Sequence, residues 1–213
     1  MRPDWVTISS LATAGGTLVL AIATFSAVRS ANRAARTSER SFLVALRPVL
    51  FQSRRDDPTQ KIRWVDNHYA RVDGGQASIE NVDGVMYLAM SLRNVGSGIA
   101  VIQAWRADRA ESGRTNLVRP DLDDFCPQTR DLYVPAGDSS FWQAAIREPD
   151  DRHRLSVLEG IEAGSFSIDV LYSDHEGGQR TISRFYVNRS PSEESTWLCS
   201  VVRHWNLDRR DPH

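Results

Sequence analysis

The chain begins with a long run of residues that carry no charge. Residues Trp5 to Val28 are 24 consecutive uncharged positions, in which Thr, Ser and Gly interrupt the apolar side chains. As a helix at ~1.5 Å per residue, this run reaches about 36 Å, enough to cross a ~30 Å hydrocarbon core with some tilt. Trp5 lies where an interfacial aromatic residue is expected. We therefore predict a transmembrane helix within residues 1–28.

A cleaved signal peptide is the alternative for the same segment, with Arg2 as its basic start. Cleavage requires small residues at fixed positions after the apolar run, and Phe25 and Arg29 occupy those positions. This arrangement favours a retained membrane anchor.

The helical pattern continues beyond the apolar run. Residues 29–47 are rich in Ala and Arg and contain neither Gly nor Pro, and Pro48 predicts that the helix ends at about Arg47. At ~100° per residue the arginines of this segment fall on one stripe. Such a stripe is suited to anionic lipid headgroups. The candidate headgroup-binding residues are Arg29, Arg33, Arg36 and Arg40.

Small residues mark another face of the same helix. Small side chains four positions apart favour close approach of two helices and hence self-association. The candidate helix-packing residues are Gly15, Gly16, Ala23, Ala27, Ala31 and Ala35. A third interpretation is a solvated, alanine-rich stalk whose arginines only fix the membrane topology. The sequence leaves the three interpretations open.

From Pro48 onward the hydrophobic period changes from helical to alternating. In Val85–Arg93 and in Ser165–Tyr172, apolar side chains occupy every second position, as in half-buried strands. The turn cluster Asp174–Gly178 predicts a hairpin that begins with the second of these strands. The further candidate strands are Pro48–Ser53, Ile99–Arg106, Ser140–Ile146, Arg180–Val187 and Trp197–Trp205, with Lys61–Tyr69 as an extra one.

About seven short strands predict an all-β fold, an antiparallel β-sandwich in residues 48–205. The polar stretches Val72–Gly84 and Glu111–Asp138 are interpreted as loops or a small insertion. The predicted organisation is a transmembrane helix (1–28), a juxtamembrane helix (29–47), the β domain (48–205) and a disordered tail (206–213).

Composition excludes several classes of protein. The 26 basic and 27 acidic residues leave a net charge of −1, so no global basic field exists for binding nucleic acid. Two cysteines are too few for a disulfide scaffold. Of the basic residues only Lys61 is a lysine, a bias that GC-rich coding explains without any special arginine chemistry.

The charges beside the apolar run predict its orientation. Arg2 and Asp4 precede the run, whereas arginines dominate the segment after it and only Glu39 opposes them. The positive-inside rule therefore places the C-terminal domain in the cytoplasm and the N-terminus outside, with the helix in the inner (plasma) membrane. In the cytoplasm Cys126 and Cys199 are expected to be reduced, and the opposite topology would make a bridge between them a candidate.

The sequence contains no recognisable catalytic or metal-binding motif. The five histidines are scattered singly, and no nucleophile elbow, P-loop or dinucleotide-binding glycine pattern occurs. The carboxylates in Asp121–Asp124 and Glu148–Asp151 are candidate calcium ligands or, more simply, residues of solvated loops. We therefore expect no enzyme activity, no cofactor and no metal.

The sharpest local motif is Asn94-Val-Gly96-Ser-Gly98-Ile-Ala100, between two predicted strands. Gly96 and Gly98 permit a positive φ in a tight connection, and the Asn94 amide can bond to the turn backbone. This structural turn resembles the N-x-G-x-G/A-x-A element of bacterial immunoglobulin-like domains of the cell-adhesion-related type. With the Arg-rich stalk and the ending Arg203-His-Trp-Asn-Leu-Asp208, the layout also resembles a group of small actinobacterial single-span membrane proteins. The resemblance implies an immunoglobulin-like sandwich and no catalytic residues.

These patterns together predict a membrane-anchored, non-enzymatic interaction module that forms a homo-oligomer through its N-terminal helix. The alternatives are a ligand-sensing or effector subunit of a membrane assembly and a cell-envelope binding protein with the sandwich outside. Trp64 and Trp205 are the candidates for an exposed contact patch that meets an unknown protein partner.

Overall fold

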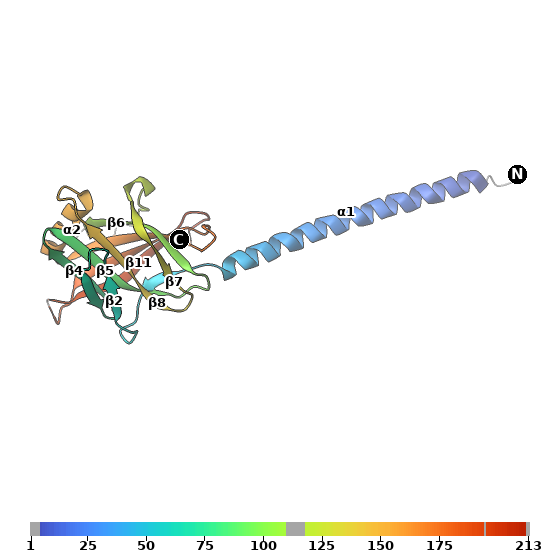
Figure 1. Cartoon of the computed structure of the whole chain (residues 1–213). Helices are drawn as coiled ribbons and strands as arrows, with labels where there is room; N and C mark the ends of the chain where they lie inside the picture. The colour runs from blue at the N-terminus through green and yellow to red at the C-terminus, as the bar shows by residue number, and fades with distance from the viewer. Residues whose placement is uncertain (1–4, 110–117, 194, 212–213) are drawn as a thin grey trace. The chain divides into compact units, whose positions relative to one another are not determined.

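The computed structural model describes residues 5–109, 118–193 and 195–211; within the first helix, the side chains of residues 5–8, 10–12, 40 and 43–45 lie outside this description. The chain divides into two compact units, Met1–Val44 and Ala45–His213. The first unit is helical, and the second is built mostly of β-strands with one further α-helix (Figure 1).

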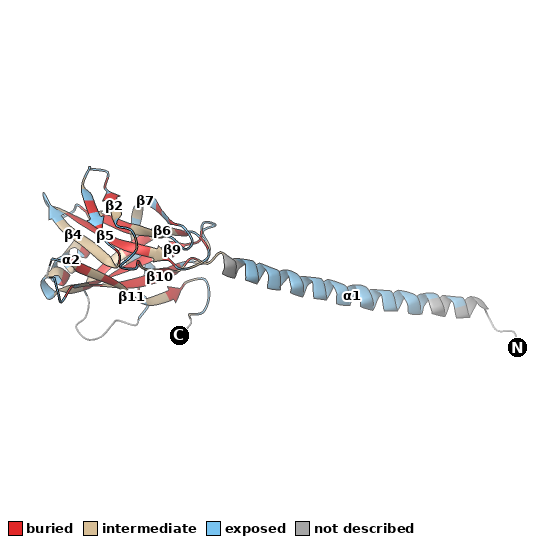
Figure 2. Cartoon of the chain, turned by 90° about the horizontal axis from the view of Figure 1, so that it is seen from below, coloured by how far each residue is buried: buried red, intermediate tan, exposed pale blue. Residues whose placement is uncertain are grey.

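The helix α1 runs without interruption from Trp5 to Ala45. The predicted boundary at residue 28 is no break in the helix, because Ala and Arg sustain the helical propensity beyond the apolar run. The Thr side chains within it bond to their own helix: the hydroxyls of Thr13, Thr17 and Thr24 donate to the carbonyl four residues earlier at 2.8 to 2.9 Å. All described side chains of α1 are exposed (Figure 2), and α1 is the one helix of the described chain that is long and apolar enough to cross a membrane.

The second unit has eleven strands in its described part, more than the seven or so expected. Two of them, β2 (Gln60–Arg63) and β3 (Tyr69–Val72), form a separate antiparallel hairpin. The other nine are β1 (Leu50–Gln52), β4 (Gln76–Val82), β5 (Val85–Asn94), β6 (Ala100–Arg109), β7 (Cys126–Val134), β8 (Ser139–Ile146), β9 (Ser165–Ser173), β10 (Thr181–Arg189) and β11 (Trp197–Asn206).

These nine strands belong to one antiparallel sheet, in the order β1-β5-β4-β11-β10-β9-β6-β7. Strand β8 also pairs with β5, along the edge that β1 and β4 leave free. The sheet curls until its ends approach each other (Figure 1). At that point the side-chain amide of Gln128 in β7 donates to the backbone carbonyl of Gln143 in β8 at 2.9 Å.

The alternation predicted for β5 and β9 is confirmed. The inward side chains of both strands belong to the main hydrophobic core: Met86, Leu88, Met90 and Leu92 from β5, and Phe166, Ile168, Val170 and Tyr172 from β9. The opposite face of β5 is also buried, because Tyr87 and Ala89 pack under the β2–β3 hairpin in a second, smaller core. Figure 2 shows the buried residues concentrated along the central strands.

Segments interpreted as loops contain regular structure. Val72–Gly84 holds β4, and the described part of Glu111–Asp138 holds β7 and the short 3₁₀ turn η1 (Leu122–Asp124), while residues 110–117 lie outside the description. The residues of β4 are half-buried or exposed with no alternation, so no period of two marks this strand. The helix α2 (Arg152–Ala163) also received no prediction; the Asp151 side chain caps its start and Gly164, at φ 77°, ends it.

The expected disordered tail is wrong as far as the structure describes it, to residue 211. Asn206 is the last residue of β11, and its backbone N–H donates to the Asp211 carboxylate at 2.5 Å. The Arg180 guanidinium binds the Asp208 carboxylate at 2.8 Å. Polar composition suggested solvation, but these side chains are the partners that hold the segment in place.

Candidate functional site

The two motifs singled out in the sequence meet at one place, the junction segment, which we define as residues 46–52. This segment follows α1 along the chain, belongs to the β-domain unit and contains β1. Its surroundings are the candidate site, because they fix how the β domain begins after the apolar helix.

The Asn94 side chain is the centre of the first half of the site. Its Oδ1 accepts from the backbone N–H of Val49 at 3.1 Å and of Gly96 at 3.0 Å. Its Nδ2 donates to the carbonyls of Gly98 at 2.6 Å and Val134 at 3.0 Å. Asn94 is fully buried, and four hydrogen bonds satisfy the whole capacity of its amide. A buried polar group satisfied in this way specifies one geometry for the turn and for the junction segment.

The two glycines of the motif allow the backbone of the junction segment to approach closely, and neither adopts a positive φ. Neither Gly96 nor Gly98 is among the glycines with positive φ, so the expected role in the turn is wrong. A Cβ at Gly96 would lie 2.3 Å from the carbonyl oxygen of Arg47, and one at Gly98 would lie 1.6 Å from that of Leu46. The backbone of the junction segment occupies the space of the missing side chains. Ala100, the last motif residue, is fully buried.

Backbone hydrogen bonds complete this half of the site. The N–H of Ser97 donates to the carbonyl of Arg47 at 3.0 Å, and the N–H of Val95 donates to that of Val49 at 2.9 Å. The loop between β5 and β6 therefore holds the junction segment through side-chain and main-chain groups together.

The second half of the site comes from β9, β10 and β11. The N–H of Leu50 donates to the Tyr172 hydroxyl at 3.2 Å, which lies 2.9 Å from the Ser183 hydroxyl, which in turn lies 2.7 Å from Nδ1 of His204. The His204 ring packs against Phe51 with ring centroids 5.1 Å apart. Burial raises the pKa of Tyr172 to about 12, so this hydroxyl keeps its proton at neutral pH. The Tyr172 hydroxyl therefore acts here as a structural hydrogen-bonding group.

One further contact ties the junction segment to the ending Arg203–Asp208. The Arg47 guanidinium donates to the side-chain carbonyl of Asn206. We call the whole arrangement the clasp; its residues are Asn94, Gly96, Gly98, Tyr172, Ser183, His204 and Asn206. Sequence reasoning missed Tyr172 and Ser183, although the alternation already placed Tyr172 on the inward face of β9.

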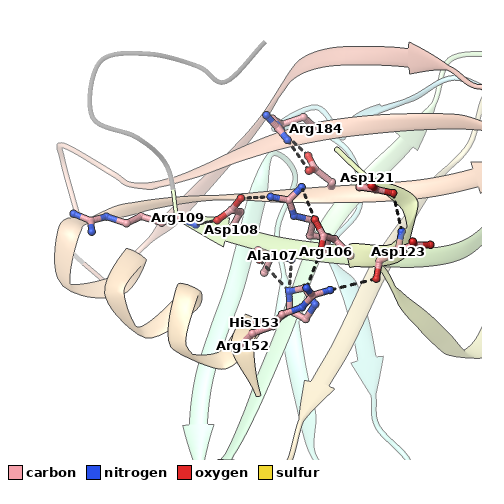
Figure 3. Close-up of polar contacts among 11 residues, drawn as sticks. Arg106, Ala107, Asp108, Arg109, Asp121, Asp123, Arg152, His153 and Arg184 are labelled. Atoms are coloured by element: carbon pink, nitrogen blue, oxygen red, sulfur yellow. Dashed lines mark hydrogen bonds and ion pairs between the residues drawn. The ribbon is translucent and has the colours of Figure 1, made fainter. Parts of the chain in front are cut away.

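A second polar group is a charged row across β6, β9 and β10 (Figure 3). The strand register aligns Arg106, Asp169 and Arg184 on neighbouring strands. Arg184 holds Asp169 with two hydrogen bonds of 2.7 Å, and only 1% of the Asp169 side chain and 5% of the Arg184 side chain are exposed. Burial raises the pKa of Asp169, and the hydrogen bonds from Arg184 oppose that rise. Both groups are buried and paired with each other, which makes them part of the structure of the sheet.

The carboxylate groups weighed as calcium ligands have other roles. The Asp124 carboxylate forms ion pairs with the guanidinium groups of Arg152, at 2.8 Å, and Arg106, at 3.8 Å. Asp121 accepts the N–H of Asp123 and thereby caps η1, as Figure 3 shows. Among the described residues no group of His, Cys, Asp and Glu is arranged to hold a metal ion. The Asp121 and Asp124 side chains therefore contribute contacts to the fold itself.

The buried histidine and the cysteines provide no nucleophile either. His153 contacts the backbone of Ala107 through Nδ1 at 3.0 Å (Figure 3) and packs on Trp105 with ring centroids 5.3 Å apart. Both cysteines are free thiols. Burial raises the pKa of Cys199 to about 12 and also raises that of Cys126. Both therefore stay protonated and inert at neutral pH.

The tryptophans expected on an exposed patch are buried, and that prediction is wrong. Trp64 is 4% exposed, and its Nε1 donates to the carbonyl of Ala144 at 3.0 Å. Trp205 is 2% exposed, with the Arg184 guanidinium 4.9 Å and the Arg203 guanidinium 5.8 Å from its ring centroid. Stacked cations replace water over the indole ring, so its burial leaves no apolar surface for a partner.

The described candidate residues of α1 lie on its exposed surface. This holds for the small residues Gly15, Gly16, Ala23, Ala27, Ala31 and Ala35 and for the described arginines Arg29, Arg33 and Arg36, while the side chain of Arg40 lies outside the description. At Gly15 and Gly16 a Cβ would meet nothing within 4 Å. The surface of α1 is therefore open to lipid or to another helix.

Comparison with known proteins adds no relative: no family model, no curated protein and no solved structure matches this chain.

Proposed function

We propose that this chain is a single-pass membrane protein whose β domain is a non-enzymatic interaction module. The observation that carries the proposal is the exposure of α1. Every residue from 13 to 39 is exposed, including Leu18 at 63% and Phe25 at 68%. Each such side chain gains about 1.5–3 kcal/mol when it leaves water. A bilayer is the environment that supplies this gain along a helix of sufficient length.

The charge pattern supports an orientation with the β domain in the cytoplasm. The arginines at 29, 33 and 36 follow the apolar run, and the positive-inside rule keeps such residues on the cytoplasmic side of the inner (plasma) membrane. The N-terminus then lies outside.

The clasp supports a stable β domain whose first segment is held by residues from several strands. Asn94 and Asn206, which are 112 positions apart in the sequence, both bind the junction segment. An immunoglobulin-like sandwich remains part of the proposal. Its support is the connection at Asn94–Ala100, which joins β5 to β6 in different parts of the curled sheet, as connections between two layers of a sandwich do.

Two alternatives belong to other classes. In the first, the domain senses a ligand or acts as the effector subunit of a membrane assembly, and its assembly changes with that ligand. In the second, the domain lies outside and binds components of the cell envelope. Both keep the anchor and differ in topology or partner.

A measurement of membrane topology tests the proposal. We would fuse a fluorescent protein and, separately, an exported phosphatase to the C-terminus of the full chain. The expected result is fluorescence without phosphatase activity. Phosphatase activity without fluorescence would overturn the orientation and favour the envelope protein. Loss of the full chain from the membrane fraction after alkaline extraction would refute the anchor itself.

Self-association through the small-residue face has its own test. Ala27→Leu with Ala31→Leu puts bulk into that face and should reduce crosslinked oligomers. Ala21→Leu is the matched control, because this position lies about 120° from Ala27 around the helix. Oligomers that persist unchanged in the double variant would show that the helix packs through another face.

A further inference from the structure

The β2–β3 hairpin carries a basic face. Its inward residues, among them Ile62 and Ala70, are buried in the smaller core. Its outward residues form two cross-strand pairs, Lys61 with Arg71 and Arg63 with Tyr69, and all four side chains are exposed. Three cations and one tyrosine thus share a flat face of a two-stranded sheet.

The pairing of Lys61 with Arg71 is electrostatically unfavourable. Residues directly opposite in an antiparallel pair have their Cβ atoms about 4.5–5.5 Å apart, and like charges at this position destabilise the pair. Neither residue makes an ion pair with any carboxylate in the described part of the chain. A fold that keeps such a pair without a counterion gains from an anion brought by another molecule.

Carboxylates in and around the hairpin are already engaged. Asp66 accepts from the Tyr87 hydroxyl at 2.7 Å and from Arg147 at 2.8 Å. Glu80 lies 3.0 Å from Nε2 of His68, and Asp73 accepts from the hydroxyl of Thr59. Arg147 therefore neutralises Asp66, and in the described part of the chain neither Glu80 nor Asp73 forms an ion pair with Lys61 or Arg71.

The hairpin is also packed against the rest of the domain, and its turn carries one exposed apolar side chain. The Trp64 indole anchors it through the hydrogen bond to Ala144, and the Trp64 ring packs edge-on to Tyr87 with centroids 5.2 Å apart. Val65, next to this anchor, is 84% exposed, and Tyr69 is 62% exposed. Cations beside an exposed valine and an amphipathic tyrosine match the chemistry of the headgroup region, where phosphates lie next to apolar chains.

We propose that the outward face of this hairpin, Lys61, Arg63, Tyr69 and Arg71 with Val65 at its tip, docks on the anionic headgroups of the bilayer that holds α1. This inference rests on the membrane anchor proposed above. Each cation near an anionic surface strengthens binding roughly fivefold, so three provide about a hundredfold. That gain is weak for a free domain and sufficient for a tethered one, because the tether makes docking an intramolecular step. An acidic peptide is the alternative partner, but its carboxylates would make no apolar contact with the exposed Val65.

Lys61 provides the test, because it is the only lysine in the chain. The full-length protein is reconstituted in vesicles of phosphatidylcholine, with or without phosphatidylglycerol, and treated with an uncharged amine-acylating reagent. Mass spectrometry of the peptide that carries Lys61 gives its rate of acylation and separates it from the N-terminal amine. We expect acylation at least about fivefold slower with the anionic lipid. The difference should disappear in 1 M salt, where the Debye length is about 3 Å.

Two double variants distinguish the basic face of the hairpin from the net charge of the domain. Arg63→Gln with Arg71→Gln removes two of the three cations without placing a carboxylate opposite Lys61, and should bring the two rates together. Arg119→Gln with Arg209→Gln changes the net charge equally at exposed positions elsewhere and should leave the lipid effect intact. Equal rates in both lipids, or an equal effect of the two double variants, would overturn the docking proposal.

The two proposals fail in different ways. Flotation of the vesicles reports the anchor independently of the hairpin. A protein that floats but shows no lipid effect on Lys61 refutes the docking alone. A protein that does not float refutes the anchor and the docking that rests on it. Protection of Lys61 by a soluble polyglutamate but not by anionic vesicles would assign the basic face to an acidic polypeptide and refute the lipid proposal.

Discussion

Replacement of Asn94 by alanine is the most direct test of the clasp. The variant removes four hydrogen bonds, two accepted from Val49 and Gly96 and two donated to Gly98 and Val134. The net contribution of a hydrogen bond is about 1 kcal/mol, and a buried group left without its partner costs more. We therefore expect the free energy of unfolding of the β domain to fall by about 3–5 kcal/mol. For a domain of this size, that corresponds to a melting temperature lower by roughly 6–20 °C.

The assay is thermal and urea unfolding of the full chain in detergent, followed by tryptophan fluorescence. Five of the six tryptophans lie in the β-domain unit, so the signal reports on that unit. Asn188→Ala is the control, because within the described residues the Asn188 side chain donates only to the carbonyl of the next residue, at 3.0 Å, and its loss should cost less than about 1 kcal/mol. If the two variants were equally stable, the clasp would not be a source of stability and the reasoning would fail.

Three further predictions concern other contacts. Gly98→Ala should destabilise the domain by at least about 2 kcal/mol in urea unfolding, because its Cβ collides with backbone and not with a mobile side chain. Arg184→Met leaves the buried Asp169 carboxylate unpaired and should cost about 3–5 kcal/mol, whereas the double replacement with Asp169→Leu should recover most of it; no recovery would refute the pairing argument. Hydrogen bonds from Arg180 lower the pKa of Asp208 below 3.8, so its stabilisation is complete above that pH and is lost as the pH falls through the folded-state pKa. The stability difference between wild type and Asp208→Asn should therefore shrink below pH 3.8, and a constant difference would contradict the assignment.

The sequence predicted the elements whose two faces differ in polarity. The period of two was sufficient to predict the strands β5 and β9, because each has one face in the main core. The turn Asp174–Gly178 also predicted the hairpin of β9 and β10. The register set by that turn places Asp169 opposite Arg184, so the sequence also contained the information needed to predict this ion pair.

Other elements left no such signal. In β4 no residue is fully buried, so its side chains follow no period. Trp64 and Trp205 were predicted to lie on the surface, but the first packs in the smaller core under the hairpin and two guanidinium groups stack on the second. The role of Gly96 and Gly98 depends on the junction segment about 50 positions earlier in the chain. Long-range packing decides all three cases, and local patterns do not report it.

The clasp has a consequence for the synthesis of the protein. Arg47 and Asn206, which it joins, are 159 positions apart. At about 5–20 residues per second, a ribosome needs roughly 8–30 s to make the chain between them. For most of this interval the first strand of the domain has been made while the last has not, so the sheet cannot close. Nascent chains therefore pass through a long stage with unpaired strand edges, in which chaperones and proteases compete with folding. Synonymous codons that slow the ribosome between these positions should lower the yield of folded protein without changing a single contact in it.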